Sequence, residues 1–197
     1  MNVRELVEHY DSVLTVDEWI LWNPVTWMVV EPLDGPWSLQ RIGHKVSDEQ
    51  DFRTTGIHVK EGMEDEDSPH LFIDFQGHDF FLFDTYDITD RQERLQRLLG
   101  ESSLIWSVHF AGPGKYTFNH LVNGKTQVSV ADILHDDTFS PGTPLADDID
   151  ELRSAWRVQP GKYSSSAVLA VMSMASDVTI SSEWFDSVQR ALVLEDF

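Results

Sequence analysis

The chain has 197 residues, of which 41% are hydrophobic and 11% are aromatic, enough apolar material for one domain, residues 1–197, to bury its own core. Its 34 Asp and Glu against 14 Lys and Arg give a net charge of -20, which opposes direct binding to nucleic acid and to anionic membranes. Because the chain has no cysteine, disulfides, thiol catalysis and Cys-ligated zinc are excluded. The first residues lack the apolar segment of a signal peptide, and no apolar run reaches membrane-spanning length, so we expect a cytoplasmic protein.

The N-terminal region contains two helix-start signals followed by a strand. Asn2 and Glu5 have the spacing of a capping box and predict a first helix. Thr15 and Glu18 repeat that spacing and predict a second, short helix. The aromatic and β-branched run 26–30 is typical of a strand. The apolar face of the first helix comprises Val3, Leu6, Val7, Tyr10 and Leu14.

The central region predicts a hairpin, a helix and a meander. Apolar runs at 71–75 and 80–86 flank Gln76-Gly77, which indicates a hairpin whose second strand is interior, because four consecutive apolar residues supply both faces. Residues 89–100 have the capping and leucine pattern of a helix. Three alternating segments then predict an antiparallel meander, with Asn123-Gly124 as a tight turn: 104–110, 116–122 and 126–130.

The C-terminal region predicts three helices. Leu145, Ile149, Leu152 and Trp156 form one helical stripe, and residues 163–176 carry no charge, which is typical of a buried helix. The last helix would place five apolar residues on one face: Trp184, Phe185, Val188, Ala191 and Leu192. We therefore expect an α+β fold: an antiparallel sheet of five to six strands within 1–135, with helices on one face and a C-terminal helical subdomain, 143–197, packed on it.

Few segments of the sequence resemble catalytic, phosphate-binding or metal-binding motifs. The segment 112–115, Gly-Pro-Gly-Lys, lacks the earlier Gly and the following Ser or Thr of a phosphate-binding loop, and it joins two strands. His70, Asp74 and His78 are spaced by four residues, near His109 and His120, and are residue types that bind zinc or iron. This spacing does not fit a defined metal motif, so we expect no catalytic residues, no bound metal and no cofactor.

Acidic residues are concentrated in two segments that we expect to be solvated. Residues 61–67 hold five acids and no base, and four of them are consecutive residues that we predict to contact a basic partner: Glu64, Asp65, Glu66 and Asp67. Residues 132–151 hold seven acids and no Lys or Arg. The second segment offers two apolar contact candidates, Leu134 and Phe139, beside four acids that we predict to bind a partner: Asp136, Asp137, Asp147 and Asp148.

Residues 71–132 also carry a recognisable order of segments. An aromatic-led apolar strand with an acid is followed by a leucine-bearing helix, an apolar strand, and an aromatic strand that ends in a polar residue and Gly: 80–84, 95–99, 105–108 and 118–128. This region resembles an uncharacterised actinobacterial family, a domain of unknown function, although Asp84 stands where the family pattern has Glu. The resemblance implies a fold and no activity.

A small, acidic chain without cysteine or a catalytic motif is typical of a stoichiometric protein binder. We expect a non-enzymatic, acidic protein-binding module, with a bacterial inhibitor or immunity protein that covers a basic toxin or enzyme as the first hypothesis. Two alternatives stay open. One is a nucleic-acid mimic that occupies a DNA- or RNA-binding protein, and the other is a metal-dependent enzyme that uses His70, Asp74 and His78.

Overall fold

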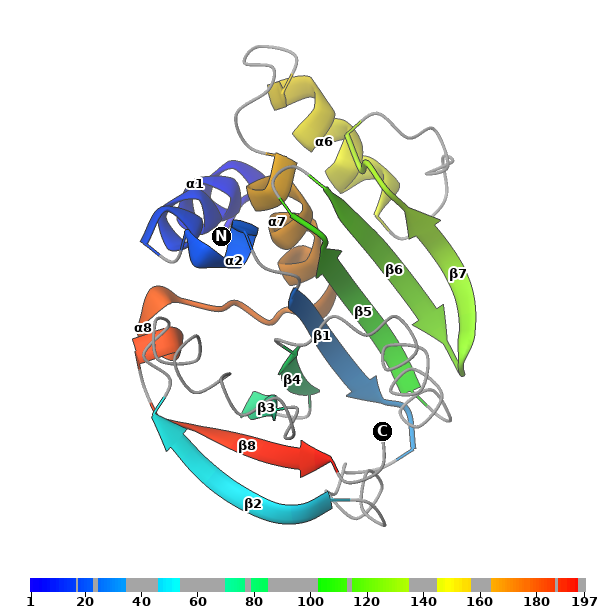
Figure 1. Ribbon diagram of the computed structural model, residues 1–197. Helices are drawn as coiled ribbons and strands as arrows, with labels where there is room; N and C mark the ends of the chain where they lie inside the picture. Colours follow the sequence, from blue (N-terminus) through cyan, green and yellow to red (C-terminus); the bar gives the residue numbers. More distant parts are fainter. Residues whose placement is uncertain are drawn as a thin grey trace.

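The computed structural model describes residues 1–16, 18–22, 25–34, 46–53, 70–76, 79–84, 103–112, 115–134, 145–156, 164–186 and 188–194. The protein is α+β, as predicted, with one antiparallel sheet and helices packed on it (Figure 1). No helix in these ranges is long and apolar enough to cross a lipid bilayer. In chain order the elements are α1 Val3–Val16, α2 Trp19–Trp22, β1 Val25–Pro32, β2 Val46–Arg53, β3 His70–Gln76, β4 Asp79–Asp84, β5 Ser103–Phe110, β6 Tyr116–Val122, β7 Lys125–Val130, α6 Ala146–Trp156, α7 Ser164–Ser176, α8 Ser182–Asp186 and β8 Val188–Leu194.

Among the described residues the sheet has eight strands in the order β2-β8-β3-β4-β1-β5-β6-β7, and every neighbouring pair is antiparallel. The prediction of five to six strands was therefore wrong. Six strands match predicted segments, and the two additional ones are β2 and β8. The sequence of β2, Val-Ser-Asp-Glu-Gln-Asp-Phe-Arg, is mostly polar, so it lacks the apolar alternation from which strands are inferred.

The C-terminal segment is a strand, whereas the sequence pattern predicted a helix. Only Ser182–Asp186 is helical at this end of the described chain, and β8 inserts between β3 and β2. The run from Val188 to Leu194 is short and rich in apolar residues, and periodicity alone does not separate a buried strand from a helix in such a run. Because β8 belongs to the main sheet, the predicted C-terminal helical subdomain is wrong in this part.

The first helix starts as predicted. The backbone N–H of Asn2 donates to Glu5 Oε2 and the backbone N–H of Glu5 donates to Asn2 Oδ1, both at 2.9 Å, which is a complete capping box. The second capping box is wrong, because Thr15 lies inside α1 and its hydroxyl donates to the carbonyl of Asp11 at 2.7 Å. A Thr four residues after a helical carbonyl can form this bond, so the Thr15 side chain bonds within α1, which continues to Val16, instead of capping the next helix.

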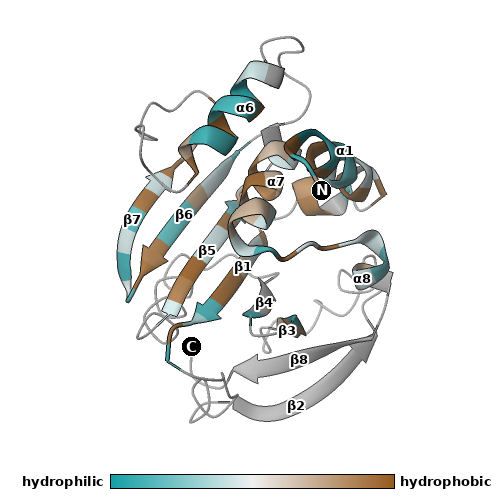
Figure 2. Cartoon of the chain, turned by 180° about the vertical axis from the view of Figure 1, so that it is seen from behind, coloured by the Kyte–Doolittle hydropathy of each residue, from teal (hydrophilic) through white to brown (hydrophobic). Residues whose placement is uncertain are grey.

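The helices α1 and α7 pack together over one face of the sheet, and α7 contacts β5 directly. Figure 2 shows α7 as a hydrophobic helix in front of the sheet, whereas the outer sides of α1 and α6 are hydrophilic. Residues 167–172 are all fully buried, as the uncharged sequence of α7 predicted. The helices α1, α7 and α8 and the sheet therefore enclose a hydrophobic core.

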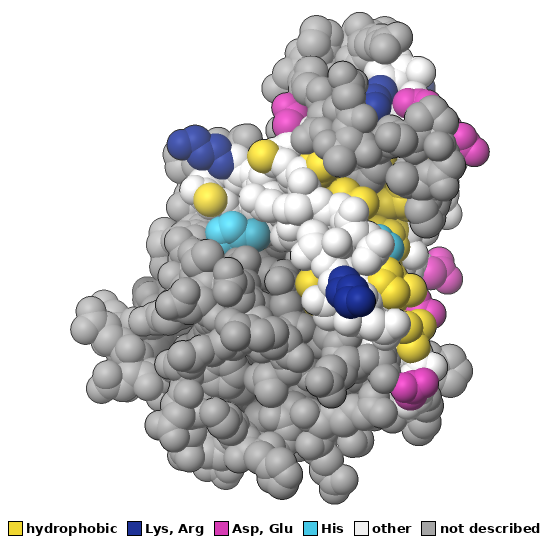
Figure 3. Space-filling model, turned by 90° about the vertical axis from the view of Figure 1, so that its right-hand side faces the viewer, with side chains coloured by type: hydrophobic (Ala, Val, Ile, Leu, Met, Phe, Trp, Pro, Cys, Tyr) yellow, Lys and Arg dark blue, Asp and Glu magenta, His cyan; other side chains and the backbone are white. Residues whose placement is uncertain are grey.

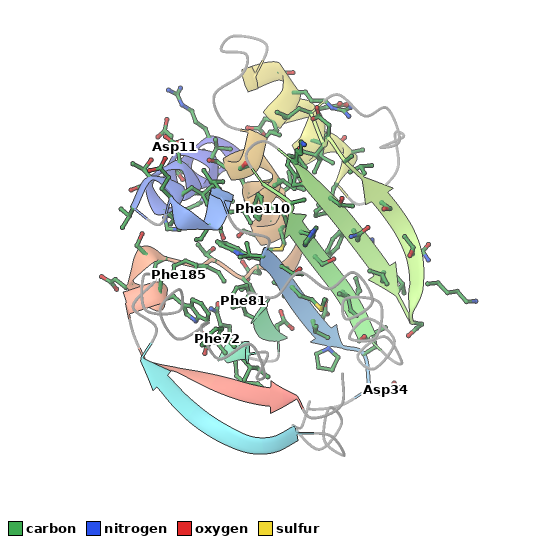
Figure 4. The ribbon with its side chains drawn as sticks, in the orientation of Figure 1. Asp11, Asp34, Phe72, Phe81, Phe110 and Phe185 are labelled. Atoms are coloured by element: carbon green, nitrogen blue, oxygen red, sulfur yellow. The ribbon has the colours of Figure 1, made fainter. Side chains whose placement is uncertain are left out.

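Trp27, fully buried on β1, is the centre of that core. Its indole lies 6.2 Å from the ring of Tyr10, 6.0 Å from Phe81, 6.4 Å from Phe110 and 5.8 Å from Phe185, measured between ring centroids. Figure 4 shows Phe81, Phe110 and Phe185 converging from three elements. Mostly edge-on aromatic contacts of this kind add to the stabilisation from area burial.

The β5–β7 meander is confirmed with its turn. Val122 pairs with Lys125 across a two-residue connection in which Asn123 and Gly124 have φ values of 50° and 72°. Positive φ at both positions is what a type I′ hairpin turn requires. The β3–β4 hairpin is confirmed too, and β4 is interior as predicted, since it pairs with both β3 and β1. The predicted helix 89–100 and the predicted loop 61–67 lie outside the described residues.

Candidate functional site

The first turn of α6 carries the acids that the sequence predicted to bind a partner and that the structure describes. Asp147 is exposed and Asp148 is half-buried. They are followed on the same helix by Asp150 and Glu151, both exposed. These four residues are called the acidic face of α6 below. The Leu145, Ile149 and Leu152 stripe of the same helix is buried, so the hydrophobic pattern of the sequence leaves the acids on the solvent side.

Arg153 ties this helix to the segment that follows β7. Arg153 Nη2 donates to the carbonyl of Ile133 at 3.3 Å, and its Nη1 lies 3.8 Å from Asp150 Oδ1. The Arg153 side chain is only 17% exposed, whereas that of Asp150 is 73% exposed. An exposed carboxylate at this distance gains little from the pair, whereas the hydrogen bond to Ile133 holds α6 against the segment that follows β7.

That segment is fixed by two further hydrogen bonds. The backbone N–H of Ile133 donates to the Tyr116 hydroxyl at 2.9 Å, and the backbone N–H of Leu134 donates to Asp132 Oδ1 at 3.0 Å. Burial raises the pKa of the Tyr116 phenol far above its ordinary value, so the hydroxyl stays neutral and acts as a structural acceptor. The acids of α6 consequently project from a helix with a defined position.

The remaining predicted contact residues have different outcomes. Leu134, which the sequence indicated as a possible contact residue, is buried, so its side chain is not available to a partner on the surface of the protein. Asp136, Asp137 and Phe139 lie outside the described residues. The same holds for the acids of the first segment, Glu64, Asp65, Glu66 and Asp67.

The histidine and aspartate set is not brought together in the described part of the chain. Asp74 is half-buried and accepts a long hydrogen bond of 3.4 Å from Gln76 Nε2, while the side chain of His70 and all of His78 lie outside the described residues. His120 pairs with Trp106 and therefore shares its face of the sheet, whereas His109 follows Trp106 by three residues on β5 and therefore lies on the opposite face. Among the described residues, no group of three His, Asp or Glu side chains is placed to hold a metal ion.

The imidazole of His120 packs on an indole. The rings of His120 and Trp106 are stacked, with centroids 3.7 Å apart and an angle of 7° between their planes. His120 Nε2 is buried without a hydrogen-bond partner, and burial lowers the pKa of the imidazole. The sequence indicated His120 only as a residue near a possible metal-ligand set and gave no sign of this stack, since the pairing depends on the register between β5 and β6.

Segment 112–115 is a connection between antiparallel strands, as expected. Lys115 donates its backbone N–H to the carbonyl of Gly112, and Ala111 donates to the carbonyl of Lys115, both at 3.0 Å. Gly112 has a φ of 123°, which favours glycine. Because β6 follows directly, there is no helix N-terminus here to hold a phosphate.

Comparison of the chain with protein-family models, with curated proteins and with solved structures finds no match. The resemblance to an actinobacterial family therefore stays a prediction.

Proposed function

We propose that this protein is a non-enzymatic, acidic binding module that covers a basic surface of another protein, in the manner of a bacterial inhibitor or immunity protein. The observation that carries the proposal is the acidic face of α6. Its four carboxylates share the side of one helix whose other side is buried, and in the described part of the chain Asp150 forms an ion pair with Arg153, at 3.8 Å. Carboxylates fixed in this way attract a basic partner without first having to be ordered.

The net charge of the protein favours its association with a basic partner. A net charge of -20 accelerates the encounter with a basic protein and repels acidic competitors. Nucleases and other toxins that act on nucleic acid carry basic surfaces, because those surfaces bind phosphate. Such a toxin is accordingly the partner class that we expect.

The acids in the first turn of α6 could also serve to stabilise the helix, and this second role must be tested together with partner binding. Asp147 and Asp148 lie in the first turn of α6, where a negative charge stabilises a helix by roughly 0.3–1 kcal/mol through the helix dipole. If that were their only role, neutralising them would lower the stability of the protein and leave partner binding unchanged. Stability and binding must therefore be measured on the same variants.

The test pairs the chain with the proteins encoded beside its gene. A stoichiometric complex with a basic protein, whose activity is lost in the complex, supports the proposal. The variant Asp147→Asn/Glu151→Gln should then bind more weakly than Glu31→Gln/Glu183→Gln, a control that removes two exposed acids elsewhere. Equal affinities in the two variants, or no complex with any neighbouring product, would count against the acidic face of α6.

The two alternative functions gain less support. A nucleic-acid mimic needs carboxylates that repeat along a surface at the spacing of phosphates, whereas the acids of α6 cluster within residues 147–151. A metal-dependent enzyme needs ligands that converge, and the described residues supply no such group.

A further inference from the structure

The acids of this chain are distributed unevenly, and one edge of the sheet lacks them. None of the 34 Asp and Glu falls between residues 102 and 131, the stretch that contains β5, β6 and β7. Lys115 and Lys125 are its only Lys or Arg residues, and both are exposed. This meander is thus neutral to weakly basic in a protein whose net charge is -20.

Strand β7 forms the outer edge of the meander. It is the last strand in the sheet order, and among the described strands it pairs only with β6. Lys125, Thr126, Gln127 and Ser129 are exposed along it. Figure 3 looks onto this edge and shows the Asp and Glu side chains of the described residues around it rather than over its middle. An edge strand presents backbone N–H and C=O groups that can pair with a strand of another chain.

The two ends of β7 carry opposite charges. The strand begins at Lys125, and Asp132 follows two residues after its end. No carboxylate among the described residues lies within ion-pair distance of Lys125. Asp132 is half-buried, and its Oδ1 accepts the Leu134 N–H. When two such strands pair antiparallel about a twofold axis, the start of each lies beside the end of the other, which brings each Lys125 toward Asp132 of the second copy.

We infer that β7 is a contact surface between two copies of this chain, which pair antiparallel, edge to edge. Acids elsewhere on the surface repel a second molecule of the same charge, so the acid-free edge is where two copies can approach closely. A bulge at Gln127 interrupts the ladder of β6 and β7, which leaves a short regular stretch for pairing. The dimer is therefore weak and dependent on concentration, and it leaves the acidic face of α6 available. The inference does not depend on the proposed function.

Sedimentation velocity of the full chain from about 10 µM to about 1 mM tests this inference. The wild type should dimerise within that range. Lys125→Glu should weaken the dimer by about tenfold or more, because it places like charges together at both ends of the ladder. Arg4→Glu changes the net charge equally but lies on α1, away from β7 (Figure 1), so it should leave the dimer within about twofold of the wild type.

A charge exchange separates a direct contact from a general charge effect. Lys125→Glu combined with Asp132→Lys should restore most of the lost association, provided that circular dichroism shows the double variant folded. Hydrogen exchange of residues 125–131 in the wild type should slow as the concentration rises, which a contact at another surface would not produce. A wild type that stays monomeric to about 1 mM, or a dimer that Lys125→Glu and Arg4→Glu weaken equally, would overturn the inference.

Discussion

The imidazole of His120 on β6 lies flat against the indole of Trp106 on β5, with ring centroids 3.7 Å apart. The two residues pair directly in the register of these strands. His120 Nε2 has no hydrogen-bond partner, and burial lowers the pKa of the ring below its ordinary value of 6.5. The stacked pair is therefore stable with a neutral imidazole and opposes its protonation.

This relationship predicts how stability depends on pH. As the pH falls through 6.5, the unfolded chain takes up a proton at His120 that the folded chain resists, so unfolding becomes easier until the pH reaches the folded-state pKa. His120→Phe keeps an aromatic ring on Trp106 and removes the titration. From pH 7 to pH 5, the free energy of unfolding of the variant minus that of the wild type should therefore increase, by at most about 1.4 kcal/mol per pH unit.

Urea denaturation of both proteins at several pH values measures this difference. An imidazolium stacked on an indole also gains a cation–π attraction, which favours protonation in the folded state. If the free energy of unfolding of the wild type instead rises relative to that of the variant toward acid pH, this attraction outweighs burial and the prediction is wrong.

The turn between β6 and β7 supplies a second prediction. Gly124 has a φ of 72°, where a β-branched residue is strained, so Gly124→Val should lower the free energy of unfolding by at least about 1 kcal/mol. Asn123→Gly is the matched control, because glycine accepts the φ of 50° at that position. Thermal and chemical denaturation should place the control near the wild type and Gly124→Val well below it, and equal stabilities would contradict the assigned turn.

A third prediction concerns the hydroxyl of Tyr10, which joins α1 to the end of α7. It bonds to the Ser173 hydroxyl and accepts the backbone N–H of Ile180 at 3.2 Å, while His9 Nε2 donates to the Ile180 carbonyl at 2.7 Å. Tyr10→Phe leaves the buried Ile180 N–H without its acceptor, so it should cost about 1–3 kcal/mol of stability.

Ser173→Ala is the control for Tyr10→Phe, because the Tyr10 hydroxyl can still accept from Ile180. We expect it to cost less than Tyr10→Phe, and the double variant to cost less than the sum of the two. Strict additivity in denaturation experiments would show that the two hydroxyls do not act together.

The parts of the fold that the sequence predicted are those with local determinants. The capping box of Asn2 and Glu5 and the Asn123-Gly124 turn each depend on a few adjacent residues, and both are present. By contrast, β8 pairs with β3, more than a hundred residues earlier in the chain, and its apolar run suits a helix equally well. The stack of Trp106 and His120 was missed for a related reason, since register is a property of two strands together.

The position of the acids on α6 was also predictable, because it too depends on a local sequence pattern. The stripe of Leu145, Ile149 and Leu152 indicated a helix and so placed Asp147 and Asp148 on its solvent side, as observed. No local pattern distinguishes acids that bind a partner from acids that keep a protein in solution, because both are exposed and hydrated. Charge density alone thus predicts a location for binding, and kinetics must decide the role.

The last prediction addresses that decision through association rates. Burying many carboxylates in an interface is costly unless each finds a cation, so most of the acids should lie at the rim of a complex and act by steering. Neutralising Asp136, Asp137, Asp147 and Asp148 to their amides should then slow association with a basic partner more than it accelerates dissociation. Because salt screens steering beyond about 10 Å at 0.1 M, the difference from the wild type should shrink as salt rises. Stopped-flow measurements at several salt concentrations test both statements, with the amides of the acids in residues 61–67 as the comparison set. If both sets bind at the wild-type rate in low salt, the acids only keep the protein in solution.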